Sequence, residues 1–102
     1  MKVVFSAEAR TNLRDIALYI ARDNPVRAHS FVQELRETAK DLVKAPYGFP
    51  LLPGYESSDI RRKPYQAYLI FYVVREDRIL IVDVLHSARD YEGILFPDRF
   101  DL

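Results

Sequence analysis

The chain has 102 residues, 49% of them hydrophobic, and its 15 basic and 15 acidic residues give a formal net charge of zero. This length and apolar content suit one folded domain, and the charge balance argues against a dedicated nucleic-acid binder, since such proteins carry a basic excess. The chain has no cysteine, no apolar run of the roughly 18 residues that a membrane helix needs, and a start too short and polar for a signal peptide, so we expect a cytoplasmic protein without disulfides or thiolate metal sites.

The first 22 residues predict a short strand followed by an amphipathic helix. Residues 2–5 form an apolar run of strand length, and Ser6 stands where an N-cap belongs. Apolar side chains then recur at positions i, i+3, i+4 and i+7, the spacing of one helix face. These are Leu13, Ile16, Ala17 and Ile20. We therefore expect a helix over 7–22.

A second helix follows after a very short connection. Asn24 is suited to cap it, and Pro25 is suited to its first turn, where the missing N–H is not needed. Apolar residues at helical spacing predict that it runs over 25–44. Because only about two residues separate the two helices, we expect them to pack as an antiparallel hairpin.

The second half of the chain predicts a long loop and then three strands. Residues 45–58 contain three prolines and two glycines, which exclude a regular element, and the apolar side chains among them are expected to seal an edge of the core. Residues 59–63 form a charged strand candidate that ends at Pro64, as suits a sheet edge. Two longer apolar runs, 67–74 and 79–85, flank a polar turn and predict a β-hairpin.

The element order is therefore β-α-α-β-β-β, in an α+β class. We expect a two-layer sandwich in which the αα-hairpin packs on one face of a small, mainly antiparallel sheet. All of residues 1–102 belong to this one domain, with a C-terminal tail at 91–102. The other face of the sheet is expected to remain open for function.

Two groups of polar residues within the strands admit both a structural and a functional interpretation. Arg61 and Lys63 are expected on one face of their strand and Arg62 on the other, either as a solvated edge or as a cationic grip on a carboxylate or phosphate. Tyr65, Tyr68 and Tyr72 are expected to be half-buried sheet residues, although a tyrosine on an open face could stack on a base or bond a partner.

The last strand carries the most distinctive polar residues. Asp83 interrupts an apolar run, so we expect it to form a structural ion pair, with Arg61, Arg62, Arg75 and Arg89 as candidate partners. His86, Arg89 and Asp90 follow at the strand's exit. They form either a junction that ties the tail to the sheet or part of an acid–base site. The two histidines lie far apart in sequence, and no spacing predicts a zinc site.

Five stretches of the chain together match one known pattern in their order and spacing. They are Ala-x-x-Asn-Leu-Arg-Asp-Ile-Ala-Leu-Tyr-Ile-Ala (9–21), Asp23-Asn24-Pro25 with Ala28 and Phe31, Ile60-Arg61-Arg62, Tyr68-Leu-Ile-Phe-Tyr72, and Val84-Leu-His-Ser-Ala-Arg-Asp90. With them the chain resembles the RelE/ParE superfamily of bacterial type II toxins over nearly its full length. The resemblance is closest to the ParE branch, and the fold that it implies agrees with the one derived above.

The resemblance implies a toxin held inactive by a cognate ParD-like antitoxin. ParE-like members are associated with poisoning DNA gyrase, which implies a non-catalytic, protein-binding inhibitor without a cofactor, and neither a membrane nor a specific DNA sequence is expected as a partner. RelE-like members instead cleave messenger RNA on the ribosome, and this is the alternative. The balanced charge and the Ser87 that follows His86 depart from the RelE pattern and favour the ParE activity.

The expected working surface lies at the end of the sheet and in the tail. The residues expected to bind the target are Arg61, Arg62, His86, Arg89, Asp90, Tyr91 and Phe96. If the protein were a nuclease, Arg61, Arg62, His86 and Arg89 would hold and polarise the phosphate, with a tyrosine assisting. The apolar tail residues, which include Ile94, Leu95, Phe96, Phe100 and Leu102, either reach the target or fold back onto the sheet. The antitoxin is expected on the helical hairpin and the 45–58 loop.

Overall fold

A computed structural model describes residues 1–100, with side chains described as far as Asp98. Leu102 and the side chain of Phe100, both counted in the predicted tail, lie outside the described residues. The elements in chain order are β1 (Lys2–Phe5), α1 (Ala7–Ala21), α2 (Pro25–Lys40), β2 (Arg61–Tyr65), β3 (Tyr68–Val74), β4 (Arg78–His86) and α3 (Tyr91–Leu95), with 3-10 helices at Asp41–Lys44, Glu56–Ser58 and Pro97–Phe100. The predicted order β-α-α-β-β-β is confirmed, and the short α3 is an addition to it.

The two long helices begin at the capping residues that the sequence predicts. The side-chain oxygen of Ser6 accepts a hydrogen bond from the backbone N–H of Ala9 at 3.0 Å, and that of Asn24 accepts one from the N–H of Arg27 at 3.0 Å. The Ser6 hydroxyl also donates to the backbone carbonyl of Val82 at 2.7 Å. The start of α1 is therefore fixed to β4 as well as capped.

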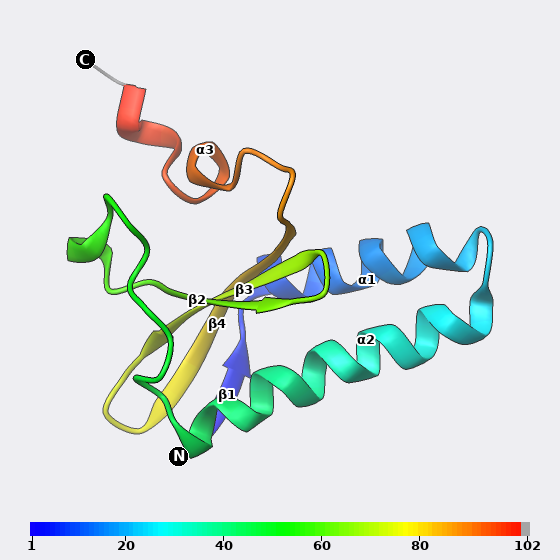
Figure 1. The fold of residues 1–102 in the computed structure, drawn as a ribbon, viewed down its shortest axis with the longest axis horizontal. Coiled ribbons are helices and arrows are strands. Elements are labelled where there is room, and N and C mark those ends of the chain that lie inside the picture. The colour runs from blue at the N-terminus through cyan, green and yellow to red at the C-terminus, as the bar shows by residue number, and fades with distance from the viewer. Residues whose placement is uncertain (101–102) are drawn as a thin grey trace.

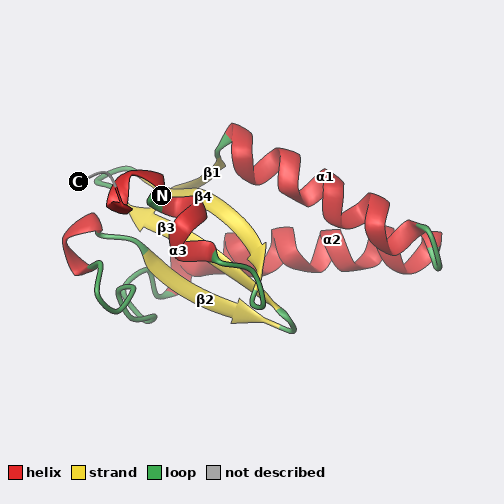
Figure 2. Cartoon of the chain, turned by 90° about the horizontal axis from the view of Figure 1, so that it is seen from above, coloured by secondary structure: helices red, strands yellow, loops and turns green. Residues whose placement is uncertain are grey.

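The helices form the predicted antiparallel hairpin on one side of the sheet. α1 ends one residue before the predicted boundary, and α2 ends at Lys40, where a 3-10 turn carries the helical path on to Lys44. The turn between the helices lies far from the strands, so the end of the hairpin projects beyond the sheet (Figures 1 and 2).

The four strands form one mixed sheet in the order β1-β4-β3-β2. β1 runs parallel to β4, whereas β2, β3 and β4 form the predicted antiparallel meander. Within the meander Tyr65 lies opposite Tyr68, which in turn lies opposite His86. These three residues are therefore level with one another at one end of the sheet, which is the end from which the tail leaves.

A β-bulge at Val82 changes the facing pattern of β4. Ile81 pairs with Tyr72 and Asp83 pairs with Phe71, so Val82 has no partner residue across the ladder. An extra residue of this kind shifts the alternation of side chains along a strand. This explains why Ile81 and Val84, three positions apart, both belong to the core on the helix side.

β2 differs from the prediction at both of its ends. It begins at Arg61 rather than at residue 59, because Asp59 has a φ of 63°, a left-handed conformation that does not fit a strand. It also continues through Pro64, which pairs with Leu69, so the prediction that Pro64 ends the strand is wrong. β2 is an edge strand, as predicted, and an edge strand tolerates a residue that cannot donate a hydrogen bond.

The sheet has a hydrophobic core on each face. The helix-side core consists of Ala9, Leu13, Ile16, Phe31, Leu35, Ala39, Leu42, Ile70, Tyr72, Ile79, Ile81 and Val84. The outer core consists of Leu52, Ile60, Leu69, Phe71, Val73 and Leu85, with Tyr55, Val82, Tyr91, Leu95 and Phe96 packed against it. The expectation of an open outer face is therefore wrong, because the strands are apolar on both sides and the 45–58 loop and the start of the tail cover the second side.

Candidate functional site

The exit of β4 is a tight junction. The N–H of Ser87 donates to the carbonyl of Ala67 at 2.8 Å, which closes the end of the β3–β4 pairing. The Nδ1 atom of His86 accepts a hydrogen bond from the N–H of Ala88 at 3.0 Å, and its ring packs edge-on against Tyr68 with centroids 5.2 Å apart. His86 is thus held between its own turn and the sheet.

Asp90 and Tyr91 then direct the tail onto the outer face. The Asp90 carboxylate caps α3 by accepting a hydrogen bond from the N–H of Gly93 at 3.2 Å. The Tyr91 ring packs on Phe71 at 5.3 Å, and its hydroxyl oxygen accepts a hydrogen bond from Arg62 at 2.9 Å. Arg62 therefore holds the tail to the sheet.

Phe96 gives the tail a second attachment. Its ring stacks on Tyr55 from the 45–58 loop, with centroids 4.1 Å apart and planes 5° from parallel. Residues 91–96 are therefore folded back onto the outer core, which was one of the two outcomes expected for the tail. Tyr91 and Phe96 both contribute to this docking and stay partly exposed.

Arg61 lies apart from the other predicted residues. Consistent with strand alternation, its side chain is on the helix side, where it donates to the carbonyl of Phe49 at 2.6 Å and lies over the Tyr47 ring at 5.1 Å. Arg61 is four residues along β2 from Tyr65, the residue level with His86. At about 3.3 Å per residue, the backbones of Arg61 and His86 are separated by roughly 13 Å along the strands.

Two adjoining hollows run between α1 and the exit of β4, and together they are termed the α1 groove. The first, of about 330 Å³, is lined by Asn12, Asp15, Ile16, Tyr19, Tyr68, Val84, Leu85, His86 and Arg89. The second, of about 350 Å³, is lined by Ala7, Glu8, Thr11, Asn12, Asp83, Leu85, Arg89 and Ile94. Three residues line both hollows, so the groove is continuous past Arg89, whose side chain is exposed.

Asp83 lies in this groove, and among the described residues it forms no ion pair, contrary to the expectation. Its side chain is 5% exposed, and its Oδ1 atom accepts hydrogen bonds from the Asn12 amide at 2.5 Å and from the N–H of Val84 at 2.9 Å. Burial raises the pKa of this carboxyl, although both hydrogen bonds and the more distant Arg89 oppose the rise. The four arginines proposed as partners were wrong because neutral donors from α1 and the backbone reach Asp83 instead.

The α1 residues of the groove were missed at the sequence level. Glu8, Asn12, Asp15 and Tyr19 recur at spacings of four, three and four, so they form one stripe along the helix. This stripe runs beside the apolar one that packs on the sheet. The helical periodicity that predicts the buried face of α1 also reveals this polar stripe. Only the folded structure shows that the stripe faces β4.

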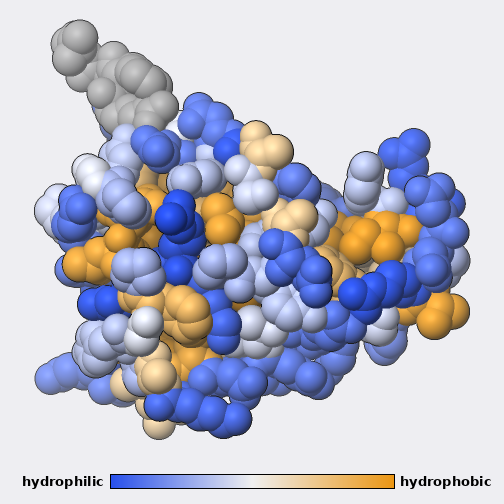
Figure 3. Space-filling view, viewed as in Figure 1, coloured by the Kyte–Doolittle hydropathy of each residue, from blue (hydrophilic) through white to orange (hydrophobic). Residues whose placement is uncertain are grey.

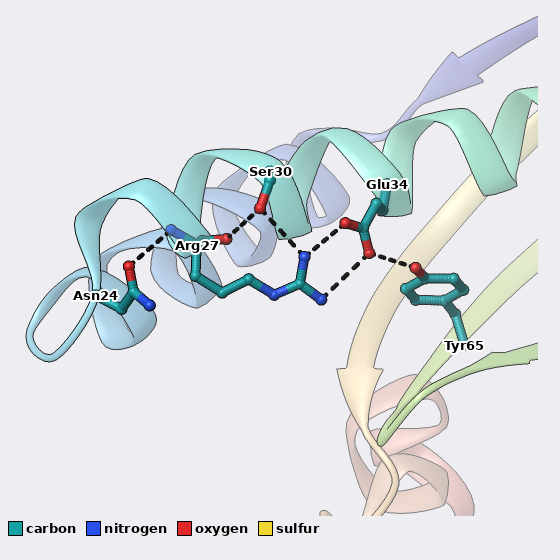
Figure 4. A network of polar contacts seen from close by, with 5 residues as sticks. All are labelled: Asn24, Arg27, Ser30, Glu34 and Tyr65. Carbon is teal, nitrogen blue, oxygen red and sulfur yellow. Dashed lines mark hydrogen bonds and ion pairs between the residues drawn. The ribbon is translucent and has the colours of Figure 1, made fainter.

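A separate polar network fastens α2 to the edge strand β2 (Figure 4). Arg27 donates to Ser30 at 3.1 Å and to both carboxylate oxygens of Glu34, at 2.5 and 3.3 Å, and the Tyr65 hydroxyl donates to Glu34 as well. The hydrogen bonds from Arg27 and then Tyr65 lower the pKa of Glu34, and the bond to Glu34 raises the pKa of Tyr65. Tyr65, a candidate for partner binding, is thus engaged within the fold.

The far end of the helical hairpin carries exposed apolar side chains. Leu18 is 62% exposed, Tyr19 is 67% exposed and Val26, at the start of α2, is 81% exposed. Figure 3 shows apolar surface at this end of the hairpin within a largely hydrophilic surrounding.

Within residues 1–100, no group of three or more histidine, aspartate or glutamate side chains is arranged to hold a metal ion. None of the helices described over that range is both long and apolar enough to cross a membrane.

Residues 3–91 match the family described as ParE toxin of type II toxin–antitoxin system, parDE. Among curated proteins, none matches this sequence. A solved structure of the chromosomal ParDE toxin–antitoxin system from P. aeruginosa is similar, with 20% sequence identity and a TM-score of 0.71, over 84% of this chain and 95% of that chain. At that identity the likeness shows a shared fold.

Proposed function

The chain belongs to the family of ParE toxins of type II toxin–antitoxin systems, and from that membership we propose that it inhibits DNA gyrase by binding to it and that a ParD-like antitoxin neutralises it. The proposal is of a protein-binding toxin without a catalytic step of its own. Two surfaces are needed, one for the target and one for the antitoxin.

The target-binding surface is proposed to be the end of the sheet where β4 gives way to the tail. His86, Arg89 and Asp90 form its centre, and the Arg62–Tyr91 contact and Phe96 hold the adjoining α3 against the outer face. Arg61 is the outlying member. A surface assembled from a rigid turn and a docked helix suits protein recognition, because little has to be ordered when the partner binds.

One observation supports binding over RNA cleavage. Arg61 and Arg62 lie on opposite faces of β2, and Arg62 is occupied with Tyr91. His86 and Arg89 border the α1 groove instead. Cleavage of a phosphodiester needs its acid, base and cationic groups within hydrogen-bond reach of one phosphate, and these four side chains do not converge in that way.

The experiment uses the whole purified protein with gyrase and plasmid DNA, and in parallel with translating ribosomes and messenger RNA. We expect gyrase-dependent DNA breaks and intact messenger. Arg89→Ala should reduce the breaks at least several-fold, because it removes an exposed cation at the centre of the surface. The matched control Arg75→Ala, an exposed arginine in the turn at the opposite end of β4, should leave them unchanged.

A different pattern would contradict the target. Messenger cleavage that disappears in His86→Ala would establish the RelE-type nuclease in place of the inhibitor. Absence of both activities from a folded protein would overturn the gyrase and ribosome assignments together.

The antitoxin surface is proposed to include the exposed end of the hairpin and the 45–58 loop. A partner that is disordered alone and folds on binding would gain by covering apolar surface of this kind. Val26→Asp should weaken the toxin–antitoxin complex by tenfold or more without unfolding the toxin, since Val26 is 81% exposed. Gln33→Asp, which places the same charge at an exposed position in the middle of α2 and outside both parts of the proposed surface, is the control. Equal affinity of both variants would exclude the hairpin end.

A further inference from the structure

The carboxylate of Asp83 is only half satisfied by the fold. Both of its hydrogen bonds, from Asn12 and from the N–H of Val84, reach the Oδ1 atom. Within residues 1–100, neither a hydrogen bond nor an ion pair reaches Oδ2, although Asp83 is only 5% exposed. Buried acceptors in native proteins are nearly always paired, so an unpaired one indicates a missing donor.

The surroundings of Asp83 define what that donor must be. Asp83 lines the second hollow of the α1 groove together with Glu8, so two carboxylates border the same space. Glu8 acts on Asp83 as a like charge. Arg89 stands on the rim, but it is exposed and forms no ion pair with either carboxylate among the described residues. The hollow therefore has an acidic wall whose neighbouring cation, Arg89, is paired with neither carboxylate among the described residues.

The hollow is large enough for more than solvent. At about 350 Å³ it would hold on the order of ten waters, each of which occupies roughly 30 Å³ in the liquid. A guanidinium group is planar, always charged and rich in donors, and it pairs with carboxylates through two parallel hydrogen bonds. It would supply the donor that Oδ2 lacks and neutralise Glu8 at the same time.

We propose that the second hollow of the α1 groove is a binding site for a basic side chain, arginine above all, from a peptide segment that lies along α1. The antitoxin is the partner in which we expect this arginine, and that part rests on the proposed function. The site itself follows from Asp83, Glu8 and the hollow, and it holds for any peptide with this chemistry.

The first experiment tests the site without any partner. The isotope-labelled whole chain is titrated with N-acetyl-arginine amide and, separately, with N-acetyl-citrulline amide, which has the same length and no charge, while backbone amide signals are followed by NMR. We expect the arginine compound alone to shift signals around Asp83 and Asn12. Asp83→Asn keeps the Oδ1 acceptor and should fold, and it should weaken binding about tenfold, the loss typical of a charge-assisted hydrogen bond.

The control and the alternatives use the same titration. Asp77→Asn removes an equal charge from the turn at the opposite end of β4 and should bind like the unchanged protein. The site would be overturned if the citrulline compound gave the same shifts as the arginine compound, or if Asp83→Asn bound the arginine compound as tightly as the unchanged protein. It would also be overturned if neither compound shifted any signal, which would mean that the hollow holds only water. Arg89→Ala should tighten binding by removing a competing cation. If binding occurs only in that variant, Arg89 itself fills the hollow and the proposal fails.

The second experiment tests the partner. Each arginine and lysine of the antitoxin is replaced by glutamine, and affinities are measured for the original toxin and for Asp83→Asn. Replacing one particular antitoxin residue should lower the affinity for the original toxin but change the affinity for Asp83→Asn very little. Such coupling is the signature of a direct pair. If the antitoxin binds and no residue couples to Asp83, the assignment of partner is wrong. If no antitoxin binds at all, the proposed function fails while the arginine titration still decides the site.

Discussion

Glu34 on α2 and Asp83 on β4 are two carboxylates at different places along the sheet, Glu34 beside the edge strand β2 and Asp83 beside α1, and they are bonded differently. Glu34 is more exposed, yet both of its oxygens accept hydrogen bonds, from Arg27 and Tyr65. Asp83 is nearly enclosed, yet among the described residues only its Oδ1 atom accepts hydrogen bonds, and both donors are neutral. The hydrogen bonds from Arg27 and Tyr65 lower the pKa of Glu34, whereas burial raises the pKa of Asp83.

The difference distinguishes a carboxylate whose hydrogen bonding is completed within the fold from one whose hydrogen bonding is not. The Glu34 network ties α2 to β2 and ends on Tyr65, so it needs nothing from outside (Figure 4). The Asp83 side opens into the α1 groove next to the turn at His86–Asp90. A polar group that a fold leaves unsatisfied at a surface hollow is better explained by a binding partner than by stability.

The largest effect is expected from apolar residues that pack near the two carboxylates. Leu35, next to Glu34, is 1% exposed in the helix-side core, and Leu35→Ala should lower the free energy of unfolding by about 3–4 kcal/mol through a closed cavity. Ile16 belongs to the same core but also borders the first hollow of the α1 groove, so Ile16→Ala should cost about 2 kcal/mol, because its cavity opens into that hollow. Urea unfolding measures both. Equal losses would indicate that the groove wall is packed as tightly as the core.

The helix caps give the next largest effect on stability. Here the larger loss is expected on the α1 side and the smaller one on the α2 side. Asn24 caps α2 through a local bond only, so Asn24→Ala should cost about 1 kcal/mol. Ser6 caps α1 and also donates to the carbonyl of Val82 at the bulge, so Ser6→Ala should cost about 2 kcal/mol. Thermal unfolding of the two variants tests this. A smaller loss for Ser6→Ala would mean that α1 is not anchored to β4 by its cap.

The fold was predictable because its local signals agree with its packing. Ser6, Asn24 and Pro25 mark the helix starts, and the apolar spacing marks the faces that pack on the sheet. The errors come from tertiary context. Pro64 was expected to end β2, but an edge strand tolerates it. The outer face was expected to be open, but the tail covers it through Tyr91 and Phe96.

The site was less predictable than the fold. His86, Arg89 and Asp90 stand out in the sequence because polar residues follow an apolar strand, and they do form one junction. That Asp83 would meet Asn12 from α1 depends on the parallel pairing of β1 with β4 and on the bulge at Val82, and neither is visible in the local sequence. The negative charge of Asp83 suggested an arginine as its partner, whereas in the fold the side-chain amide of Asn12 donates to it.

The pH dependence of stability should reveal the state of Asp83. Its pKa is raised above the ordinary value of 3.8 by burial, so its protonated form favours the folded state. That contribution is fully present below about pH 4 and is lost as pH rises through the raised pKa. The unfolding free energy of the protein minus that of Asp83→Asn should therefore fall from acid to neutral pH. A difference that rises instead would mean that a cation such as Arg89 pairs with Asp83 in solution.

Glu34 should show the opposite dependence with a smaller amplitude, because its network is solvent-accessible and screened by salt. Its pKa lies below the ordinary value of 4.5, so its contribution is present above that pH and is lost as pH falls through the lowered pKa. The unfolding free energy of the protein minus that of Glu34→Gln should rise towards neutral pH and shrink in high salt. Glu37→Gln, at an exposed glutamate three residues further along α2, is the matched control for removing a carboxylate from this helix. If Glu34 and Asp83 gave slopes of the same sign, the contrast between a carboxylate completed by the fold and one left for a partner would not hold.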